Sequence, residues 1–546
     1  MDQTCPSSNP IDPNSGFNSI TRIFHSLRHP PIHLPPYDTP LSAADYAFSL
    51  QRNSLWSNSV ALINSATAQR VLYSEFIYQT KTLATNLRSA IGLYKGDTAF
   101  LLSPNLSQVP ILYFALLSIG VVISPANPIS TEFEISRLIK LCKPVIAFAT
   151  SLTVHKLPKL RYQNILLDSP EFDSLTTTAN SCVERGEVNQ GDLAAIMYSS
   201  GTTGKIKGVM LTHRNLIAIT ASYHSQRAER EQPAVVLSPV PYFHVIGFFY
   251  SVKSVGLNET VVVMERFGFT KMLRAVEEFR VTNLGVVPPL VVALVKNDSD
   301  GYDLRTLEGV ACGGAPLGKD VIAAFTHRFP KVLVTQGYGL TETSGPVSRT
   351  IGDEEVCQRG SVGKLEGGLE AKIVDPDTDD VLPPGKQGEL WIRGPPIMKG
   401  YVGDPEATSA TLSKDGWLRT GDLCYIDNRG FLYIVDRLKE LIKYKGYQVP
   451  PAELEQLLQS HPEILDAAVI PYPSEEAGQV PVAFVVRQPQ SCIGEAEVMD
   501  FVSKQVAPYK KIRRVAFVSS IPKNAAGKIL RRELREVVLP SSSSRL

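Results

Sequence analysis

Ser199-Ser200-Gly201-Thr202-Thr203-Gly204-Lys205-Ile206-Lys207-Gly208 is the stretch around which the rest of the sequence is organised. The apolar run 194–198 before it predicts a buried strand, and residues 212–222 after it predict a helix. Glycines let backbone N–H groups turn toward an anion, hydroxyls add donors and lysine adds positive charge. This order predicts a polyphosphate site, with an ordinary polar turn as the alternative. The stretch is not a Walker A loop, because Ile206 follows Lys205.

The composition sets limits on the class of protein. A chain of 546 residues is too long for one hydrophobic core, so two or more domains are expected. The formal net charge of +1 gives no global reason to bind nucleic acid or an acidic membrane, and neither is expected as a partner. Seven cysteines are scattered without a CxxC pair, which argues against structural zinc and against a disulfide framework.

The two ends of the chain and its apolar runs bear on location. The first 30 residues are polar and contain prolines, so no secretory signal is expected. The longest nearly apolar run, 111–124, is too short to span a bilayer and predicts a core helix that leads into a strand. The final Ser544-Arg545-Leu546 fits the peroxisomal tripeptide pattern. We therefore expect a peroxisomal protein that meets an import receptor through this tripeptide, with the cytosol as the alternative.

The order of patterns predicts the domain organisation. Helical patterns alternate with short apolar strands over 43–183 and again after the phosphate loop, which is an α/β rhythm. From about 360 to 435 the texture changes to short β runs with turn signals. A cluster of charged residues at 436–440 precedes a compact segment of predicted helices and strands. We predict a large domain over 1–436 and a small domain over 437–546, which is long enough to fold independently.

Four further stretches carry chemistry. Residues 313–318 form a glycine turn that lacks the Ser or Thr of a Walker A loop, and residues 336–343 combine an aromatic ring, two glycines, a hydroxyl and a carboxylate. Asp422 lies in a turn after Trp417, where a carboxylate suits the two hydroxyls of a ribose. Lys528 follows a glycine before the last predicted helix. Taken alone, each has a plain alternative: a turn, an Asx-type turn or a surface lysine.

Taken together, these stretches resemble the adenylate-forming superfamily of acyl- and aryl-CoA synthetases, firefly luciferase and peptide-synthetase adenylation domains. In particular, the sequence is similar to plant 4-coumarate–CoA ligases and their peroxisomal ligase-like relatives, from about Phe48 onward. The resemblance implies an α/β fold: a large N-terminal domain of two α/β subdomains plus a small β-barrel-like unit, and a small hinged C-terminal α+β domain. The motifs that carry it are 199–208, 242–244, 313–318, 337–342, 420–422, 436–448 and 522–528.

The resemblance also implies roles for individual residues. Those expected to hold the β- and γ-phosphates are Ser199, Ser200, Gly201, Thr202, Thr203 and Lys207. Those expected around the adenine are Gly314, Ala315, Gln336, Gly337 and Tyr338. Thr341 would touch the α-phosphate, Glu342 would bind Mg²⁺, and Asp422 and Arg437 would hold the ribose. Those expected in the moving part and its thiol channel are Lys439 at the hinge, Lys443 and Gln448 near the adenylate, and Lys445, Gly446 and Arg266 near CoA.

The implied reaction joins a carboxylic acid to CoA at the expense of ATP, through an acyl-adenylate. Lys528 would neutralise the charge of a carboxylate that attacks the α-phosphate, and His244 would gate the passage between acid and thiol. ATP, Mg²⁺ and coenzyme A are the expected cofactors and co-substrates. A luciferase-like oxygenase, a carrier-protein loader and a nucleotide-binding protein without ligase activity are the alternatives.

Two positions depart from the hydroxycinnamate-specific ligases. Ile246 stands where a tyrosine is common, and Tyr250 stands where a small polar residue is usual. Loss of a partner for a phenol hydroxyl costs about 1 kcal/mol of discrimination or more. We therefore expect a hydrophobic acid, with a 4-coumarate- or cinnamate-like phenylpropanoid first and a medium-chain or cyclopentenyl (jasmonate-precursor) fatty acid as the alternative.

Overall fold

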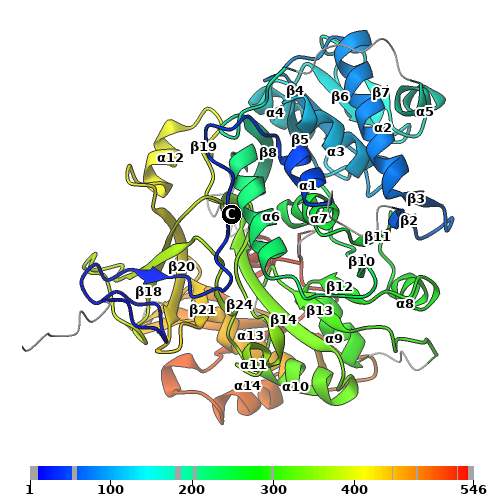
Figure 1. The fold of residues 1–546 in the computed structure, drawn as a ribbon. Coiled ribbons are helices and arrows are strands. Elements are labelled where there is room, and N and C mark those ends of the chain that lie inside the picture. The colour runs from blue at the N-terminus through cyan, green and yellow to red at the C-terminus, as the bar shows by residue number, and fades with distance from the viewer. Residues whose placement is uncertain are drawn as a thin grey trace, which may run out of the picture.

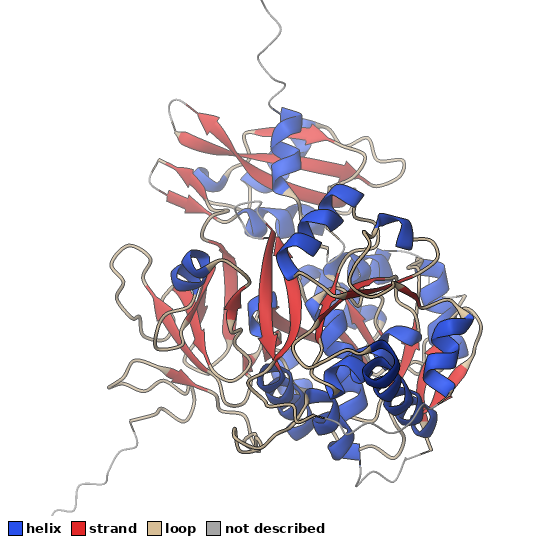
Figure 2. Cartoon of the chain, turned by 90° about the horizontal axis from the view of Figure 1, so that it is seen from above, coloured by secondary structure: helices blue, strands red, loops and turns tan. Residues whose placement is uncertain are grey.

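A computed structural model of the chain describes residues 10–51, 58–178, 186–200, 206–296, 301–315, 317–445, 447–474, 477–524 and 527–538. Its strands form two large α/β sheets, a smaller antiparallel sheet and a C-terminal sheet (Figure 1). Helices surround the strands of the two larger sheets (Figure 2). The predicted fold class, an α/β protein with a C-terminal α+β domain, is confirmed.

Each of the two large sheets is built mainly from parallel strands; the first has antiparallel strands at both edges and the second at one edge. The first sheet has the order β16 (Lys364–Leu365), β15 (Gly345–Arg349), β14 (Leu333–Leu340), β13 (Gly309–Cys312), β12 (Asn283–Val286), β10 (Val235–Leu237), β11 (Thr260–Val263), β2 (Val60–Asn64) and β3 (Arg70–Leu72). The second has the order β19 (Gly400–Tyr401), β9 (Ile206–Thr212), β8 (Leu193–Ser200), β5 (Val122–Pro125), β4 (Thr98–Leu102), β6 (Ile146–Ala149) and β7 (Ile165–Leu166).

Helices alternate with the strands of the two large sheets, as predicted for 43–183 and for the segment after the phosphate loop, whereas α12 was not predicted. They are α1 (Ala43–Gln51), α2 (Tyr73–Asn86), α3 (Gln108–Ser118), α4 (Glu132–Cys142), α5 (Pro170–Thr177), α6 (His213–Ser225), α7 (Val245–Gly256), α8 (Phe269–Glu278), α9 (Pro288–Lys296), α10 (Lys319–Arg328), α11 (Gly352–Val356) and α12 (Pro405–Thr411). The apolar run 111–124 forms most of α3 and leads into β5, as expected. No described helix combines the length and the apolar character that crossing a bilayer requires.

The smaller sheet is antiparallel and has the order β1 (Phe24–His25), β17 (Glu370–Val374), β18 (Gly388–Arg393), β20 (Leu418–Ile426) and β21 (Leu432–Arg437). The C-terminal group contains β22 (Ile442–Tyr444), β23 (Tyr447–Val449), β24 (Ile464–Ser474), β25 (Gly478–Arg487) and β26 (Arg514–Phe517), with α13 (Pro451–Ser460), α14 (Glu495–Ser503) and α15 (Arg531–Val538). This group buries an apolar core of its own, which includes Ile442, Leu454 and Val485.

One strand was not predicted. The helix predicted over 212–222 is confirmed as α6, but β9 lies between it and the phosphate loop and pairs antiparallel with β8. Residues 206–212 place buried Val209 and Leu211 in an extended segment against β8, so the loop joins two strands of a hairpin. The helix α6 begins only at His213, after the Thr212 side chain accepts a capping hydrogen bond from Asn215 N.

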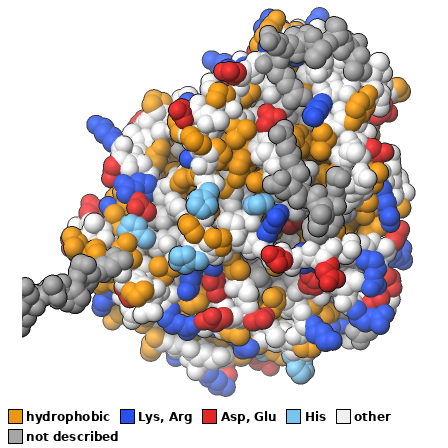
Figure 3. Space-filling model, in the orientation of Figure 1, with side chains coloured by type: hydrophobic (Ala, Val, Ile, Leu, Met, Phe, Trp, Pro, Cys, Tyr) orange, Lys and Arg blue, Asp and Glu red, His pale blue; other side chains and the backbone are white. Residues whose placement is uncertain are grey.

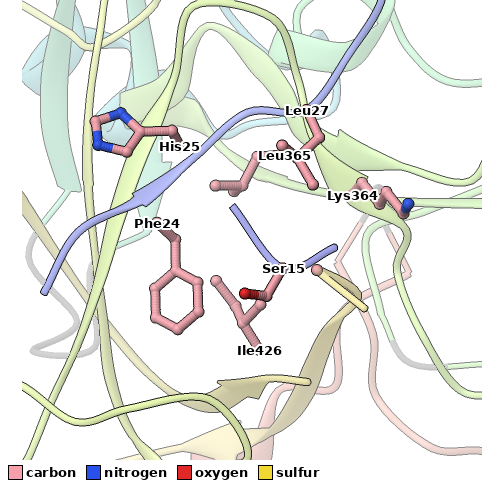
Figure 4. A pocket seen from close by; sticks show the side chains of 8 residues that line it. Ser15, Phe24, His25, Leu27, Lys364, Leu365 and Ile426 are labelled. Atoms are coloured by element: carbon pink, nitrogen blue, oxygen red, sulfur yellow. The ribbon is translucent and has the colours of Figure 1, made fainter. Parts of the chain in front are cut away.

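The N-terminal segment crosses the smaller sheet before the first helix begins. Arg28 is buried, pairs with Glu355 and donates to the carbonyl oxygen of Arg349 on β15. A small pocket lies beneath the segment, where Phe24 and Leu27 stand beside Leu365 and Ile426 (Figure 4). Residues 24–28 are therefore tied to the rest of the chain by a strand, an ion pair and apolar contacts.

His213 gives a stability prediction. It is fully buried at the start of α6, its Nδ1 accepts from Ala43 N at 3.1 Å, and burial lowers its pKa to about 4. The unfolded chain takes up this proton below its usual value of 6.5, whereas the folded chain takes it up only near 4, so stability falls as the pH drops through that window. We predict that His213→Gln removes about 2 kcal/mol of the stability loss between pH 7 and pH 5.

Thermal unfolding at the two pH values measures this difference. The matched control is His327→Gln, because His327 is exposed on α10. An equal acid-induced loss of stability in wild type and in His213→Gln would count against the prediction.

Candidate active site

The end of β8, the start of β9 and the turn after β14 meet at one point. Ser199 and Lys207 lie opposite each other in the β8–β9 register, and Ser199 Oγ donates to Glu342 Oε1 at 3.0 Å. Glu342 belongs to a short 3₁₀ turn, Thr341–Thr343, that directly follows β14. The first and fourth motifs, 143 positions apart in the chain, therefore share one hydrogen bond.

Tyr401 completes this cluster and was missed by the sequence analysis. Its hydroxyl donates to Glu342 Oε1 at 3.0 Å, and the Lys207 ammonium lies 4.3 Å from the centre of its ring. Burial, with the negative charge of Glu342, raises the pKa of the Tyr401 hydroxyl, so it stays a donor. Tyr401 lies on β19, which pairs with β9, and no motif marks it in the sequence. Only the pairing of β19 with β9 brings it to the site.

The predicted adenine-binding residues lie side by side on neighbouring parallel strands. The register aligns Cys312 with Gln336, so the turn 313–315 lies beside residues 336–338. Gly314 has a φ of +86°, a conformation that favours glycine. Gln336 is buried and its side-chain amide donates to Ser361 O at 3.0 Å, which fixes this strand against the chain behind it.

The Asp422 carboxylate is the most tightly held group of the site. It is 3% exposed, Tyr338 OH donates to its Oδ2 at 2.6 Å, and Arg437 Nε lies 3.4 Å from its Oδ1. Burial raises the pKa of the Asp422 carboxyl, and the charges of Arg437 and Lys528 and the Tyr338 hydrogen bond oppose that shift. The carboxylate therefore connects the adenine strand, the smaller sheet and the segment that carries Lys528.

Lys528 reaches this region from the C-terminal domain. Burial, and then the charge of Arg437, lower the pKa of its ammonium, while Glu440 and Asp422 act in the opposite direction. Gly527 lies so close to the large domain that an added Cβ would stand 3.3 Å from Val287 Cβ, just beyond β12. The structure thus brings Lys528 to the predicted ribose-binding pair.

The predicted gate and acid-pocket residues share one helix. His244 is the N-cap of α7 and its Nδ1 accepts from Ile246 N at 3.3 Å; burial lowers the pKa of His244 to about 4, so the ring is neutral near pH 7. Ile246 and Tyr250 are four residues apart and therefore lie on one face of α7. The Tyr250 ring packs against β12, where an added Cβ at Gly285 would stand 3.3 Å from it.

The predicted CoA-side residues lie elsewhere. Lys443 and Gln448 are exposed and face each other across the β22–β23 hairpin. Lys445 is exposed in the turn of that hairpin, Lys439 follows β21, and Arg266 is exposed after β11. Among the described residues, no contact joins Lys443 or Gln448 to Glu342 or Asp422. Gly201, Thr202, Thr203, Gly446, the tripeptide Ser544-Arg545-Leu546 and the Ser200 side chain lie outside the described part.

The donor set of the cluster fits a magnesium ion that is shared with a polyphosphate. Mg²⁺ is commonly held by one or two carboxylates together with substrate phosphates and water. Glu342 offers one carboxylate beside hydroxyls and a lysine. Within the described ranges no group of three or more His, Cys, Asp or Glu side chains forms an all-protein metal cage.

Comparison with known proteins agrees with this geometry. The model of the AMP-binding enzyme family matches residues 51–402, and that of the AMP-binding enzyme C-terminal domain matches 453–528. The 4-coumarate–CoA ligase-like 9 protein of Arabidopsis thaliana is 52% identical over 98% of both chains. The peroxisomal OPC-8:0-CoA ligase 1 of the same plant is 43% identical over 97% of this chain and 99% of its own.

A solved structure shows the same fold with a nucleotide bound. ATP-bound MatB from Rhodopseudomonas palustris superimposes with a TM-score of 0.80 at 28% identity, over 91% of this chain and 99% of its own. Both family models, the curated relatives and this superposition agree with the resemblance that the motifs indicated. The chain is a member of the AMP-binding (adenylate-forming) enzyme family.

Proposed function

We propose that this enzyme is an ATP-dependent acid–CoA ligase that forms an acyl-CoA through an acyl-adenylate. The observation that carries the proposal is that Lys528 lies near enough to Asp422 and Arg437 for their charges to act on one another, next to strands whose motif residues fit a nucleotide. The relatives named above are CoA ligases or CoA-ligase-like proteins, which favours CoA as the acceptor. A luciferase-like or carrier-loading enzyme, and a nucleotide-binding protein without activity, remain the alternatives to be tested.

The first step opposes two negative charges, the substrate carboxylate and the α-phosphate. Lys528 would neutralise both, and Arg437, whose charge acts on Lys528, would add a second positive charge. Asp422 accepts the ribose hydroxyls, with Tyr338 fixing its orientation. Ser199 and Lys207 bind the terminal phosphates, and Thr341 lies toward the α-phosphate. Magnesium, held by Glu342 and the phosphates, would supply Lewis-acid neutralisation of the leaving pyrophosphate.

The second step needs the thiol to reach the same carbonyl from another side. Lys443, Gln448 and Lys445 lie on an exposed hairpin, and no contact among the described residues joins Lys443 or Gln448 to Glu342 or Asp422. We propose that residues 437–546 turn as a small domain about Lys439, which withdraws Lys528 and brings this hairpin to the adenylate. Arg266 would then contribute to the CoA side, and His244 would gate the passage.

The acid is proposed to be hydrophobic, with a cinnamate- or 4-coumarate-like phenylpropanoid as the first candidate. Ile246 and Tyr250 form an apolar and aromatic face on α7, close to β12. The same apolar face favours a second candidate, a medium-chain or cyclopentenyl fatty acid, which agrees with the name of the OPC-8:0-CoA ligase relative. We also propose a peroxisomal location from the terminal tripeptide and from that relative, with the cytosol as the alternative.

Lys528→Ala is predicted to reduce acid-dependent ATP–pyrophosphate exchange at least about 100-fold, because one charged contact to the transition state is lost. CoA transfer from a supplied acyl-adenylate is expected to stay near the wild-type rate. The matched control is Lys523→Ala, whose ammonium pairs with Asp466 inside the C-terminal domain. Equal loss of both half-reactions would argue against this role for Lys528, and absence of any exchange in wild type across a broad acid panel would argue against the proposed function.

Asp422→Asn is predicted to raise the KM for ATP at least about tenfold, since a charged acceptor of the ribose is removed. The KM for the acid should change little. Initial rates with ATP as the varied substrate measure the effect, with Asp427→Asn in the exposed β20–β21 turn as the control. An unchanged KM for ATP would contradict the ribose role.

Ile246→Tyr combined with Tyr250→Ser is predicted to shift the ratio of kcat/KM for 4-coumarate over octanoate toward 4-coumarate by about tenfold or more, because a partner for the phenol hydroxyl is restored. Exchange assays with phenylpropanoid, medium-chain and cyclopentenyl acids give the wild-type ratio first. A wild-type enzyme that strongly prefers 4-coumarate over every alkyl acid would contradict the broader substrate class.

A further inference from the structure

Asp436 lies where the chain leaves the large domain, three residues before the proposed hinge at Lys439. It lies on β21, which pairs with β20 in the smaller sheet, and Leu438 N still donates to Gly421 O at 3.0 Å. The residues up to Leu438 are therefore fixed to the large domain. Asp436 is 6% exposed, so its carboxylate points into the molecule and not into solvent.

One partner of this carboxylate lies beyond Lys439, the proposed hinge, and the other lies on β21 itself. Its Oδ2 accepts a hydrogen bond from Ala452 N at 2.9 Å, in the first turn of α13, where free backbone N–H groups favour an anion. Its Oδ1 accepts from Arg437 N at 2.7 Å. Burial raises the pKa of Asp436 to about 6, so the group remains mostly ionised near pH 7.

Arg531, on the last described helix, acts on the same carboxylate through its charge. Its guanidinium donates to Glu440 Oε2 at 2.5 Å, to Glu455 Oε1 at 2.6 Å and to Val469 O at 3.1 Å, and its charge acts on Asp436. Arg531 therefore joins Glu440, which directly follows Lys439, to α13 and β24. All three follow the proposed hinge in the chain. Arg531 lies three residues after Lys528 at the start of α15, so any shift of this cluster moves Lys528.

We propose that Asp436 is a positioning residue: it latches the C-terminal domain, through Ala452 N and the Arg531 cluster, in the arrangement that presents Lys528 to the nucleotide site. The latch breaks when the domain turns, because its acceptor stays on β21 while its donors move with α13 and α15. The catalytic consequence rests on the proposed function, whereas the arrangement itself can be measured without any reaction.

A disulfide trap reports the arrangement directly. An added Cβ at Gly318 would stand 3.8 Å from Gln456 Cβ on α13, which is the usual Cβ separation of a disulfide. The pair Gly318→Cys and Gln456→Cys, oxidised with copper–phenanthroline, should cross-link only while the domain is latched. Serine replaces the exposed Cys357 and Cys492, and also Cys5 and Cys182, which lie outside the described residues. The buried Cys142, Cys312 and Cys424 are kept.

Asp436→Ala is expected to slow cross-linking at least about fivefold, and Asp436→Asn, which keeps an acceptor oxygen but loses the charge, to give an intermediate rate. In the enzyme without the added cysteines, Asp436→Ala should reduce ATP–pyrophosphate exchange by a similar factor and spare CoA transfer from a supplied acyl-adenylate. Asp427→Ala, in the β20–β21 turn, is the matched control.

Two results would overturn the latch. One is cross-linking of Asp436→Ala at the rate of the control. The other is an equal loss of both half-reactions together with a lowered unfolding temperature, which indicates a merely structural residue. Failure of the proposed function looks different: wild type would show no exchange with any acid, while the cross-linking difference between Asp436→Ala and its control would persist.

Discussion

A buried carboxylate, Asp422, is the constraint on which the arrangement of the site depends. Removing such a charge from water is costly unless partners surround it. Here the partners come from three parts of the chain: Tyr338 from β14, Arg437 from β21, and the charge of Lys528 from the C-terminal domain. Satisfying one carboxylate therefore fixes the relative positions of β14, the smaller sheet and Lys528. On the face of the molecule shown in Figure 3, positive and negative side chains are interspersed, in keeping with the net charge of +1.

Much of the fold could be predicted because the signals are local. Apolar runs such as 98–102 and 283–287 became strands of the parallel sheets, and 452–459 became most of α13. The motif residues could be assigned to one site only through resemblance to a family, since residues as distant as Ser199 and Glu342 share no local pattern. Tyr401 and Arg531 were missed because their importance arises from pairing across the chain: β19 with β9, and α15 with α13.

The strand after the phosphate loop could not be predicted from the local sequence. Glycines and hydroxyls before a helical pattern are typical of a loop that ends at a helix N-terminus. No prediction covered residues 209–211, yet the segment 206–212 forms β9, which places Lys207 on a strand. Positive charge at the site therefore comes from Lys207, which lies on the β8–β9 hairpin and stacks on Tyr401, and not from the dipole of α6.

The buried ion pair of Arg28 and Glu355 gives the N-terminal segment a role in the shape of the nucleotide site. Because Arg28 also donates to the backbone of Arg349, which lies opposite Gly337 in the β14–β15 register, the segment braces the outer side of the adenine strand. Shortened forms of the enzyme that begin after residue 28 would keep every motif but lose the contacts that support β15 behind β14. Expression designs for this family member should therefore retain that stretch intact.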